Sequence, residues 1–472
     1  MARCKGKTCG SSPAFRRTLL NGYGGVSYSA EALALFAQWD ALGTSATDAR
    51  KTLVNNTIVA LKSANIWSSL DFLYVWTAHS QSASLVDWKN PSTRTATANG
   101  NLTFTTDSYW QGGTTGRMAL GYNPGDGGTY NFTQNDNSFG VYFKDHTNET
   151  KVNISSQSAG SVGVDLQSVI TTFGLTTKNN SGTPRGVANF TNKGLASCER
   201  TASNSWQNRK NGYDLYNNSG YETDASNAVL NLEWMGFCRN INSAYTVFST
   251  AKQCFAFSGA RVSTFNLSYL IEKNFLNPLS LVPTKRVTFN GNSYTSTGTY
   301  LKRVLVDHTN YNDLEIQSRG ISGQTTPEMT TDATTTVFPM IKTFLTKNIH
   351  FVWELTNDMV ATSSNATTCY NNLVAHCQAL RASQSDAIII VATCLPRTTI
   401  TEVNRITLNG LVNGNADGAW NYISDVASDP NMGQAGQNTD LTYYDADTIH
   451  PNTTGYNLLA DTYIYPSILA VL

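Results

Sequence analysis

The stretch Asp445-Ala-Asp-Thr-Ile-His-Pro-Asn-Thr-Thr-Gly-Tyr456 holds the pattern on which the fold of the C-terminal part of the chain depends. Asp447 precedes His450 by three residues, in a predicted loop that leads into an apolar helix. A carboxylate in this position can bond to the imidazole, fix its tautomer and leave the other ring nitrogen free as a base. The same spacing also occurs in surface loops before a capped helix, and on these residues alone that alternative stays open.

A candidate nucleophile lies upstream, after a strand-like run at Arg286–Phe289. The run continues into Asn290-Gly-Asn-Ser293, and glycine allows a sharp turn from a strand into a helix. Ser293 would then start that helix, where its hydroxyl can meet His450 at the carboxyl edge of a sheet. Gly-Asn-Ser by itself is equally an ordinary turn in a chain rich in these residue types.

Two further segments carry candidate hydrogen-bond donors. Gly320 follows a second strand-like run, Leu314–Gln317, and a glycine there permits an exposed backbone N–H aimed into a cleft. His350–Met359 predicts a buried strand that ends in Asn357. An amide at such an end can donate to a developing oxyanion, typically contributing about 3 kcal/mol to catalysis. A helix cap is the structural alternative for Asn357.

Taken in order, these segments resemble the four conserved blocks of the SGNH hydrolases, also called GDSL-like lipases and esterases, over about residues 284–472. The resemblance implies that Ser293 is the nucleophile, His450 the base and Asp447 the partner that orients His450. It also implies an oxyanion hole, formed by the backbone N–H groups of Ser293 and Gly320 and the side chain of Asn357. No cofactor is implied.

The chain departs from the family at Asn292, where Asp is usual. A hydrolase fold that has lost activity is the corresponding alternative. The nucleophile, base and donor positions are nevertheless all occupied by competent residue types.

Alternating strand and helix patterns in residues 284–472 predict a parallel sheet with helices on both faces, which binds ligands beyond the carboxyl ends of its strands. Ser293, Gly320 and Asn357 all follow such ends. The predicted strands are Arg286–Phe289, Leu314–Gln317, Ile349–Glu354 and Ala387–Thr393, and the predicted helices are Thr297–Leu305, Pro327–Leu345, Ala361–Ala382, Thr401–Val412 and Thr454–Leu469.

Composition limits the classes of function. The 472 residues are enough for two or three domains. Only 14% of the residues are charged and the net charge is zero, so we expect no nucleic-acid partner. No apolar run is long enough for a membrane span, and the first ten residues do not begin a classical signal peptide. Surfaces rich in Asn, Thr, Ser, Gly and Tyr suit proteins exposed outside a cell or on a virion.

The cysteines predict neither a regular disulfide framework nor a metal site. The eight cysteines include no Cys-x-x-Cys pair. Cys369, His376 and Cys377 lie on one predicted helix, where core packing is the favoured reading because structural zinc takes four ligands.

The first 82 residues are predicted to form a leader and a helical attachment segment. Residues 1 to about 28 show no structural pattern, while Ser29–Trp39 and Ser45–Ala64 have helical periodicity and Ser/Thr starts that can cap a helix. A short piece at Trp67–Trp76 is predicted to complete this helical segment.

Residues 83–276 alternate apolar and polar positions in short runs separated by turns, which predicts an all-β sandwich. Short matches, such as Arg200–Trp206 before a hairpin at Lys210–Tyr213, resemble concanavalin A-like (laminin-G-like) jelly-roll domains. Aromatic faces can stack on sugar rings, although core packing is the common role of aromatics in a sandwich. The predicted strands are residues 102–105, 138–143, 162–166, 186–190, 228–232 and 254–258, and the candidate stacking residues are Trp88, Trp110, Trp206 and Tyr130.

The sequence therefore predicts a multidomain protein: a small N-terminal helical segment, a jelly-roll sandwich, and an α/β/α SGNH-type domain. The expected function is a serine esterase or deacetylase acting on acylated cell-surface polysaccharide. A catalytically inactive glycan-binding or structural protein and a lipid esterase are the alternatives. The architecture resembles bacteriophage fibre and appendage proteins, which implies a virion or extracellular location, other virion proteins as partners and, by analogy, a homotrimer. A bacterial protein exported by another route is the alternative origin.

Overall fold

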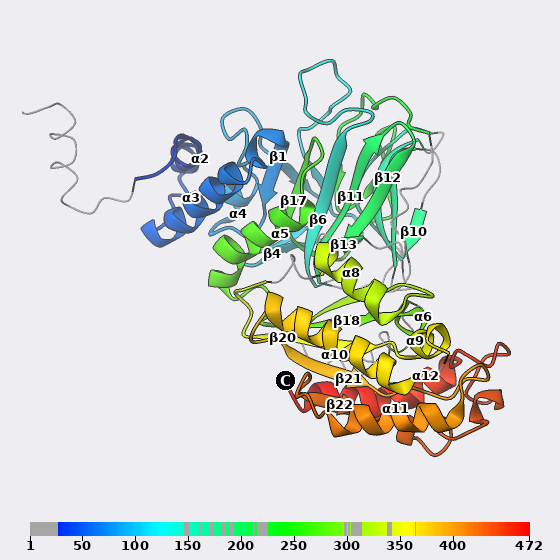
Figure 1. Cartoon of the computed structure of the whole chain (residues 1–472). Coiled ribbons are helices and arrows are strands. Elements are labelled where there is room, and N and C mark those ends of the chain that lie inside the picture. The colour runs from blue at the N-terminus through cyan, green and yellow to red at the C-terminus, as the bar shows by residue number, and fades with distance from the viewer. Residues whose placement is uncertain are drawn as a thin grey trace, which may run out of the picture.

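The computed structural model describes residues 27–145, 151–159, 162–169, 174–181, 185–187, 193–210, 213–214, 225–296, 300, 303, 314–337, 342–363 and 365–472. The predicted leader at residues 1–26, most of the predicted helix at Thr297–Leu305 and the turn of the predicted hairpin at residues 211–212 lie outside the described residues. The described residues form a pair of N-terminal helices, two large sheets, and a third sheet with helices on both faces (Figure 1).

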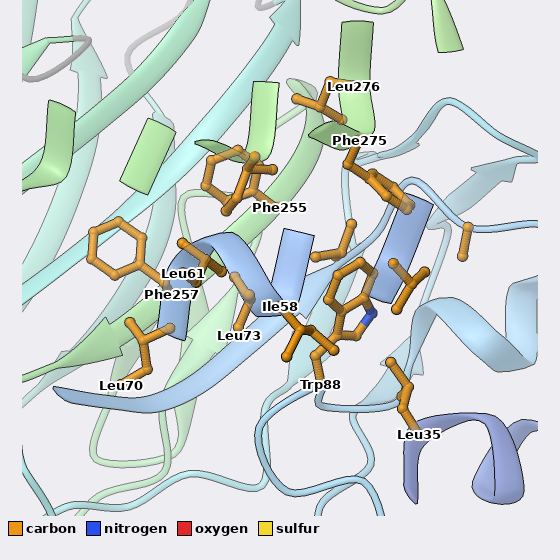
Figure 2. Packing of buried hydrophobic residues seen from close by; sticks show 14 of the residues in the cluster. Leu35, Ile58, Leu61, Leu70, Leu73, Trp88, Phe255, Phe257, Phe275 and Leu276 are labelled. Atoms are coloured by element: carbon orange, nitrogen blue, oxygen red, sulfur yellow. The ribbon is translucent and has the colours of Figure 1, made fainter. Parts of the chain in front are cut away.

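The N-terminal pair consists of α2 (Ala30–Ala41) and α3 (Asp48–Ser63), as predicted. The Ser29 and Thr47 side chains accept hydrogen bonds from backbone N–H groups of the first turns, which satisfies donors that have no partner within the helix. Buried side chains of both helices share a core with strands β1 (Leu70–Val75) and β17 (Lys252–Gly259), so the helices are fixed to the larger body (Figure 2).

The predicted third helical piece at Trp67–Trp76 is wrong beyond its first turn. Trp67–Ser69 is a 3-10 turn, and the chain then continues as strand β1, which pairs with β17 in an antiparallel arrangement. All six residues of β1 are buried. A short apolar run that is covered on both faces has no strand periodicity, so the pattern alone could not separate strand from helix.

The two large sheets have the orders β13-β12-β11-β6-β17-β4-β3, with β1 also on β17, and β10-β9-β8-β7-β14-β5-β2, with β15 also on β7 and β16 on β15. Their described strand pairs are antiparallel except for β15 on β7. Side chains of both sheets, including Phe139, Ile154 and Leu166, meet in one apolar cluster, so the sheets pack face to face. The strands are β2 (Thr97–Asn99), β3 (Thr103–Thr105), β4 (Tyr109–Gln111), β5 (Arg117–Ala119), β6 (Asn137–Asp145), β7 (Lys151–Gln157), β8 (Gly163–Val169), β9 (Gly174–Ser181), β10 (Arg185–Val187), β11 (Gly194–Ala202), β12 (Ser205–Lys210), β13 (Tyr213–Asp214), β14 (Met235–Gly236), β15 (Arg239–Ile241) and β16 (Ala244–Thr246).

The predicted sandwich is therefore present, and its jelly-roll order stays a prediction. Five of the six predicted strands coincide with or overlap an observed strand. The sixth, at residues 228–232, is wrong, because these residues form irregular chain before β14.

Three of the four aromatic side chains proposed for sugar stacking belong to the core. Trp88, Trp110 and Trp206 are at most 1% exposed, so they cannot present a face to a ligand in this structure. Tyr130 is partly buried; its ring packs edge-on against Tyr122 and its hydroxyl donates to Asp126 Oδ2 at 3.0 Å. The structure thus supports the core alternative for the three tryptophans.

After β17 the chain forms α5 (Thr264–Ile271) and a π-helical turn, η2 (Glu272–Leu276), and then enters a parallel sheet. The order of this sheet is β19-β18-β20-β21-β22, with every described pair parallel. β22 was not predicted. The strands are β18 (Lys285–Gly291), β19 (Leu314–Gly320), β20 (Lys347–Trp353), β21 (Ile388–Ala392) and β22 (Tyr422–Ser424).

Alternate residues of the central strands enter two apolar clusters. Phe351 packs on one face with the C-terminal helices, whereas Val352 packs on the other with α10 and α11, so both faces are covered as predicted. The predicted helix at Ala361–Ala382 is wrong at its start, since α9 ends and α10 begins within it. The helices are α6 (Ser293–Ser296), α8 (Thr326–Thr336), α9 (Thr356–Ala361), α10 (Ala366–Ser383), α11 (Glu402–Gly414), α12 (Thr453–Leu459), the π-helix η8 (Ala460–Ile464) and α13 (Tyr465–Leu469).

A buried ionic cluster joins η2 to the parallel sheet. Lys342 Nζ lies 2.5 Å from Glu272 Oε2 and 2.8 Å from Glu315 Oε2, and Arg286 Nη2 donates to Glu315 Oε1 at 3.1 Å. All four side chains are at most 5% exposed. Burial alone would lower the pKa of Lys342, but the two carboxylates outweigh it and raise that pKa, so the ammonium group is charged.

Across the described residues, none of the helices combines the length and apolar character that crossing a membrane requires. The cysteines in this part of the chain are free and buried. His376 is also buried, with Nδ1 2.9 Å from Thr330 Oγ1, so this histidine and its neighbours Cys369 and Cys377 belong to the core of α10.

Candidate active site

Ser293 begins helix α6 directly after the turn that follows β18. Gly291, before this turn, and Gly320, at the end of β19, are required by close packing. A Cβ on Gly291 would lie 2.4 Å from the Trp353 carbonyl oxygen, and one on Gly320 would lie 2.3 Å from the Ser296 nitrogen. Neither glycine has a positive φ, so the predicted role of Gly291 as a conformational hinge is replaced by a steric one. The close approach brings Ser293 to the carboxyl edge of the sheet.

The structure brings Ser293, His450 and Asp447 into one hydrogen-bonded chain. His450 Nε2 lies 2.8 Å from Ser293 Oγ, and His450 Nδ1 lies 2.6 Å from Asp447 Oδ2. The other Asp447 oxygen accepts from the backbone N–H groups of Ile449 and His450 at 2.9 and 3.0 Å. This arrangement leaves Nε2 as the atom that can take a proton from Ser293.

Electrostatics favour the ionised form of Asp447. Burial acts to raise the pKa of this carboxyl, but the hydrogen bonds from the His450 ring and from the backbone outweigh it, so the pKa lies below its usual value. The Tyr294 ring packs edge-on against the imidazole, with 5.7 Å between ring centres, and its hydroxyl donates to the Ile449 carbonyl at 3.0 Å. The imidazole is therefore positioned by Asp447 at Nδ1 and by the ring of Tyr294.

Asn357 lies within α9 and not at the end of β20, which stops at Trp353. Its Nδ2 donates to the Gln324 carbonyl at 3.1 Å, and its Oδ1 accepts from Arg397 Nη1 at 3.2 Å. The amide does not cap the helix, so the structural alternative for Asn357 is wrong. Because Arg397 holds the oxygen, the orientation of the amide is defined and its second N–H remains for a ligand.

The backbone of Gly320 is also placed as a donor. Gly320 ends β19, which lies at one edge of the sheet. The next residue, Ile321, donates its backbone N–H to the Gly291 carbonyl in β18 at 3.0 Å. Successive N–H groups of an extended chain point in opposite directions. The Gly320 N–H therefore points away from β18, at the same edge of the sheet as Ser293.

Glu354 is a residue of the site that sequence reasoning missed. It is 1% exposed; its Oε1 accepts from the Asn357 N–H at 2.9 Å and from Asn292 Nδ2 at 3.4 Å, and its Oε2 accepts from Thr326 Oγ1 at 3.2 Å. One carboxyl group thus joins the turn before Ser293, the start of α8 and the start of α9. A glutamate at the end of the apolar run His350-Phe-Val-Trp353 was the available signal.

Asn292, where the motif of the SGNH hydrolases usually has Asp, has a local explanation in this network. Asn292 Oδ1 accepts from the Tyr294 N–H at 2.9 Å and so caps α6, while Nδ2 donates to Glu354. Aspartate could cap the helix equally but would place a second carboxyl group beside Glu354, where the Asn292 amide now donates. Asparagine therefore keeps the turn that presents Ser293, and nothing in this geometry removes the nucleophile.

Burial, together with the nearby Asp358 carboxyl group, raises the pKa of Glu354 to about 8. A folded-state pKa above the unfolded value of 4.5 means that the native state loses stability as pH rises from about 4.5 to 8. Glu354→Gln mimics the protonated acid and should remove this loss. We expect the urea midpoint to fall between pH 5 and 8 in the native chain and to fall less in the variant.

Glu328→Gln is the matched control for that measurement. Glu328 is exposed, and its hydrogen bonds with the Thr325 N–H and hydroxyl lower its pKa from 4.5, so above about pH 5.5 it is mostly ionised in both the folded and the unfolded state. The control should keep the native slope of stability against pH. An unchanged slope in Glu354→Gln would show that Glu354 is already ionised in the native protein.

Comparisons with known proteins find solved structures that are similar to part of the chain. Neither a protein-family model nor a curated protein sequence matches it. Similar solved structures include a GDSL-like lipase from Bacteroides thetaiotaomicron, with 21% identity over 40% of this chain and 90% of that one and a TM-score of 0.32. They also include a family 3 carbohydrate esterase from Clostridium thermocellum, with 18% identity over 39% of this chain and 98% of that one and a TM-score of 0.31.

A lipase/acylhydrolase from Enterococcus faecalis is similar at 15% identity over 40% of this chain and 97% of that one, with a TM-score of 0.31. Each of these three similarities covers about two fifths of the chain. TM-scores this low do not bear on activity, for which the contacts of Ser293, His450 and Asp447 are the relevant observation.

Proposed function

We propose that this protein is a serine ester hydrolase of the SGNH type that removes acetyl or similar acyl groups from a polysaccharide. The observation that carries the proposal is the chain of contacts from Ser293 Oγ through His450 to Asp447, at 2.8 and 2.6 Å. Nucleophile and base within hydrogen-bond reach, with the base oriented by a third group, are the requirements of covalent acyl transfer.

In the reaction, Ser293 Oγ attacks the ester carbonyl while His450 Nε2 takes the hydroxyl proton. Asp447 stabilises the imidazolium ion that forms. The carbonyl oxygen becomes negatively charged and accepts from the backbone N–H groups of Ser293 and Gly320 and from Asn357 Nδ2. His450 then gives its proton to the sugar oxygen as the bond from the acyl carbon to this oxygen breaks, which releases the sugar hydroxyl and leaves the acyl group on Ser293. Water, with His450 again taking the proton, then attacks the acyl-enzyme and releases the acid and Ser293.

We also propose that the substrate is a polysaccharide and that the protein belongs to a virion. A sandwich joined to the hydrolase through a buried ionic cluster suits a protein that acts on an extended polymer, and a polar surface with few charges suits a virion fibre or appendage. A trimer of such chains and contacts with other virion proteins are part of the same proposal.

A screen of acyl esters tests the function. We expect the native chain to hydrolyse 4-nitrophenyl acetate and to lose rate on longer acyl chains, and Ser293→Ala to lose activity on all of them. Higher rates on long chains would favour a lipid esterase instead. Absence of hydrolysis by the native chain on every ester would favour the alternative of an inactive glycan-binding or structural protein.

Asn357→Ala is expected to lower turnover by about a hundredfold with little change in the Michaelis constant, because the lost donor matters most when the carbonyl oxygen gains charge. Steady-state kinetics on the acetyl ester measures both constants. Asn365→Ala, which removes the side chain that caps α10, is the control and should keep native turnover. A raised Michaelis constant with intact turnover would make Asn357 a substrate-positioning residue.

A further inference from the structure

Arg397 lies in the loop between β21 and α11, at the carboxyl edge of the parallel sheet. Its Nη1 donates to Asn357 Oδ1 at 3.2 Å, so the guanidinium group is directly beside the proposed oxyanion donor. Arg397 also acts electrostatically on Tyr294, whose ring packs against His450. The positive charge therefore lies beside Asn357 and acts on the tyrosine that packs against His450.

The next residue, Thr398, connects the same loop to the segment that carries Asp447 and His450. Thr398 Oγ1 lies 3.2 Å from Thr448 Oγ1, between Asp447 and His450 in the chain. Asn438 Nδ2 bridges the two segments by donating to Thr398 Oγ1 at 2.9 Å and to the Thr448 carbonyl at 3.0 Å. The loop that carries Arg397 is thus anchored next to the triad.

Arg397 differs from most arginines of this domain in its charge balance. Arg303, Arg319 and Arg405 each form an ion pair with a carboxylate. Within the part of the chain that the structure describes, no carboxylate pairs with Arg397, and its buried Nε has no hydrogen-bond partner. The side chain is only partly buried, and its guanidinium group, which has no carboxylate partner in the described residues, lies beside Asn357.

We propose that Arg397 recognises a carboxylate of the substrate, so that the ester cleaved at Ser293 lies on an acidic sugar or next to one. The inference rests on the proposed esterase function. Arginine presents its N–H groups in a planar fork that matches a carboxylate, and such charge-assisted hydrogen bonds are the stronger ones. Nη1 already holds Asn357, which leaves Nη2 and the second Nη1 proton for the ligand.

The same contact allows a competing role, in which Arg397 only orients Asn357. The two roles differ in their dependence on substrate charge. Loss of a carboxylate partner weakens the binding of anionic esters alone, whereas a misplaced Asn357 lowers turnover of every ester by the same factor.

The test compares 3- and 4-acetoxybenzoate with the corresponding acetoxybenzamides, which present the same ester with and without a carboxylate. We expect the native chain to prefer the anionic esters by about tenfold in kcat/KM, with the preference weakened by added salt. Arg397→Gln should lose this preference through a raised KM on the anionic esters, and any fall in kcat from the lost contact with Asn357 should be the same for the anionic and the neutral esters. Arg397→Lys, which keeps the charge, should retain part of the preference.

Arg381→Gln is the matched control, since Arg381 also lacks a carboxylate partner in the described residues but bonds to Ala419 and Asn421 at the opposite edge of the sheet. It should keep the native preference. Equal rates of the native chain on charged and neutral esters, or an equal loss on both in Arg397→Gln, would overturn the proposal. Failure of the esterase function itself is distinguishable, because the native chain would then hydrolyse none of these esters.

Discussion

Replacement of Ser293 by alanine is expected to lower the turnover of a short acyl ester by about a thousandfold or more, because it removes the nucleophile and with it the covalent route. His450→Ala should cause a loss of similar size, since the hydroxyl of Ser293 then has no base. The double variant should be no worse than either single variant, because the members of a triad act as a unit. Steady-state kinetics on 4-nitrophenyl acetate measures all three.

Ser428→Ala serves as the control for these variants. Ser428 is an exposed serine of the same domain whose hydroxyl donates to the Asp425 carbonyl at 2.7 Å, and its replacement should leave turnover unchanged. Retention of more than about a tenth of native turnover in Ser293→Ala would contradict the assignment, given the size of triad effects.

Lys342→Met is expected to destabilise the protein by about 3–5 kcal/mol, the usual cost of leaving a buried charge without its partner. The variant removes the ammonium group that lies between the carboxylates of Glu272 and Glu315. Since Glu272 belongs to the turn after the sandwich and Glu315 to the parallel sheet, the loss should reduce the stability of both parts together. Combining the change with Glu272→Gln should recover part of the loss.

The pair Lys62–Glu31 provides a control with the same chemistry. Its atoms are also 2.5 Å apart, but the side chains are 44% and 29% exposed. Lys62→Met should therefore cost no more than about 1 kcal/mol. Urea unfolding followed by fluorescence measures both variants. Equal urea midpoints for Lys342→Met and Lys62→Met would mean that the buried cluster does not stabilise the contact between the sandwich and the parallel sheet.

Local motifs explain why so much of the candidate site could be predicted from the sequence. Ser293 and Gly320 directly follow or end strands, and parallel strands bring their carboxyl ends to one edge, so their neighbourhood follows from the fold class. Asp447 and His450 are three residues apart, close enough for one loop to set their contact. The sequence predicts that Asn357 ends a strand, whereas the residue lies in α9. No glycine or proline marks the break between β20 and α9, so the pattern does not show where the strand stops.

Residues that act through distant partners could not be predicted in this way. Glu354 contacts Thr326 and Asn292, and Arg397 contacts Asn357, across 28 to 62 positions of sequence. Lys342 appeared as an ordinary lysine, since its partner Glu272 is 70 residues away. Only the folded chain shows that these charges are buried, adjacent to the site or uncompensated.

The role of the aromatic residues in the sandwich could not be predicted from their pattern either. Aromatic residues in a strand pattern occupy either the core or a ligand face, and their alternation is the same in both cases. The burial of Trp88, Trp110 and Trp206 decides this in favour of the core. The burial of β1 on both faces hid its strand character in the same way.

Covalent labelling with a fluorophosphonate tests the central claim, that Ser293 is the activated nucleophile, most directly. Such reagents phosphonylate a serine only when an adjacent base activates it, so intact-mass measurement and peptide mapping should find one adduct per chain, on Ser293. The adduct should be absent from Ser293→Ala and form far more slowly in His450→Ala. Labelling at another side chain, or no labelling of a native chain that hydrolyses acyl esters, would contradict the assignment.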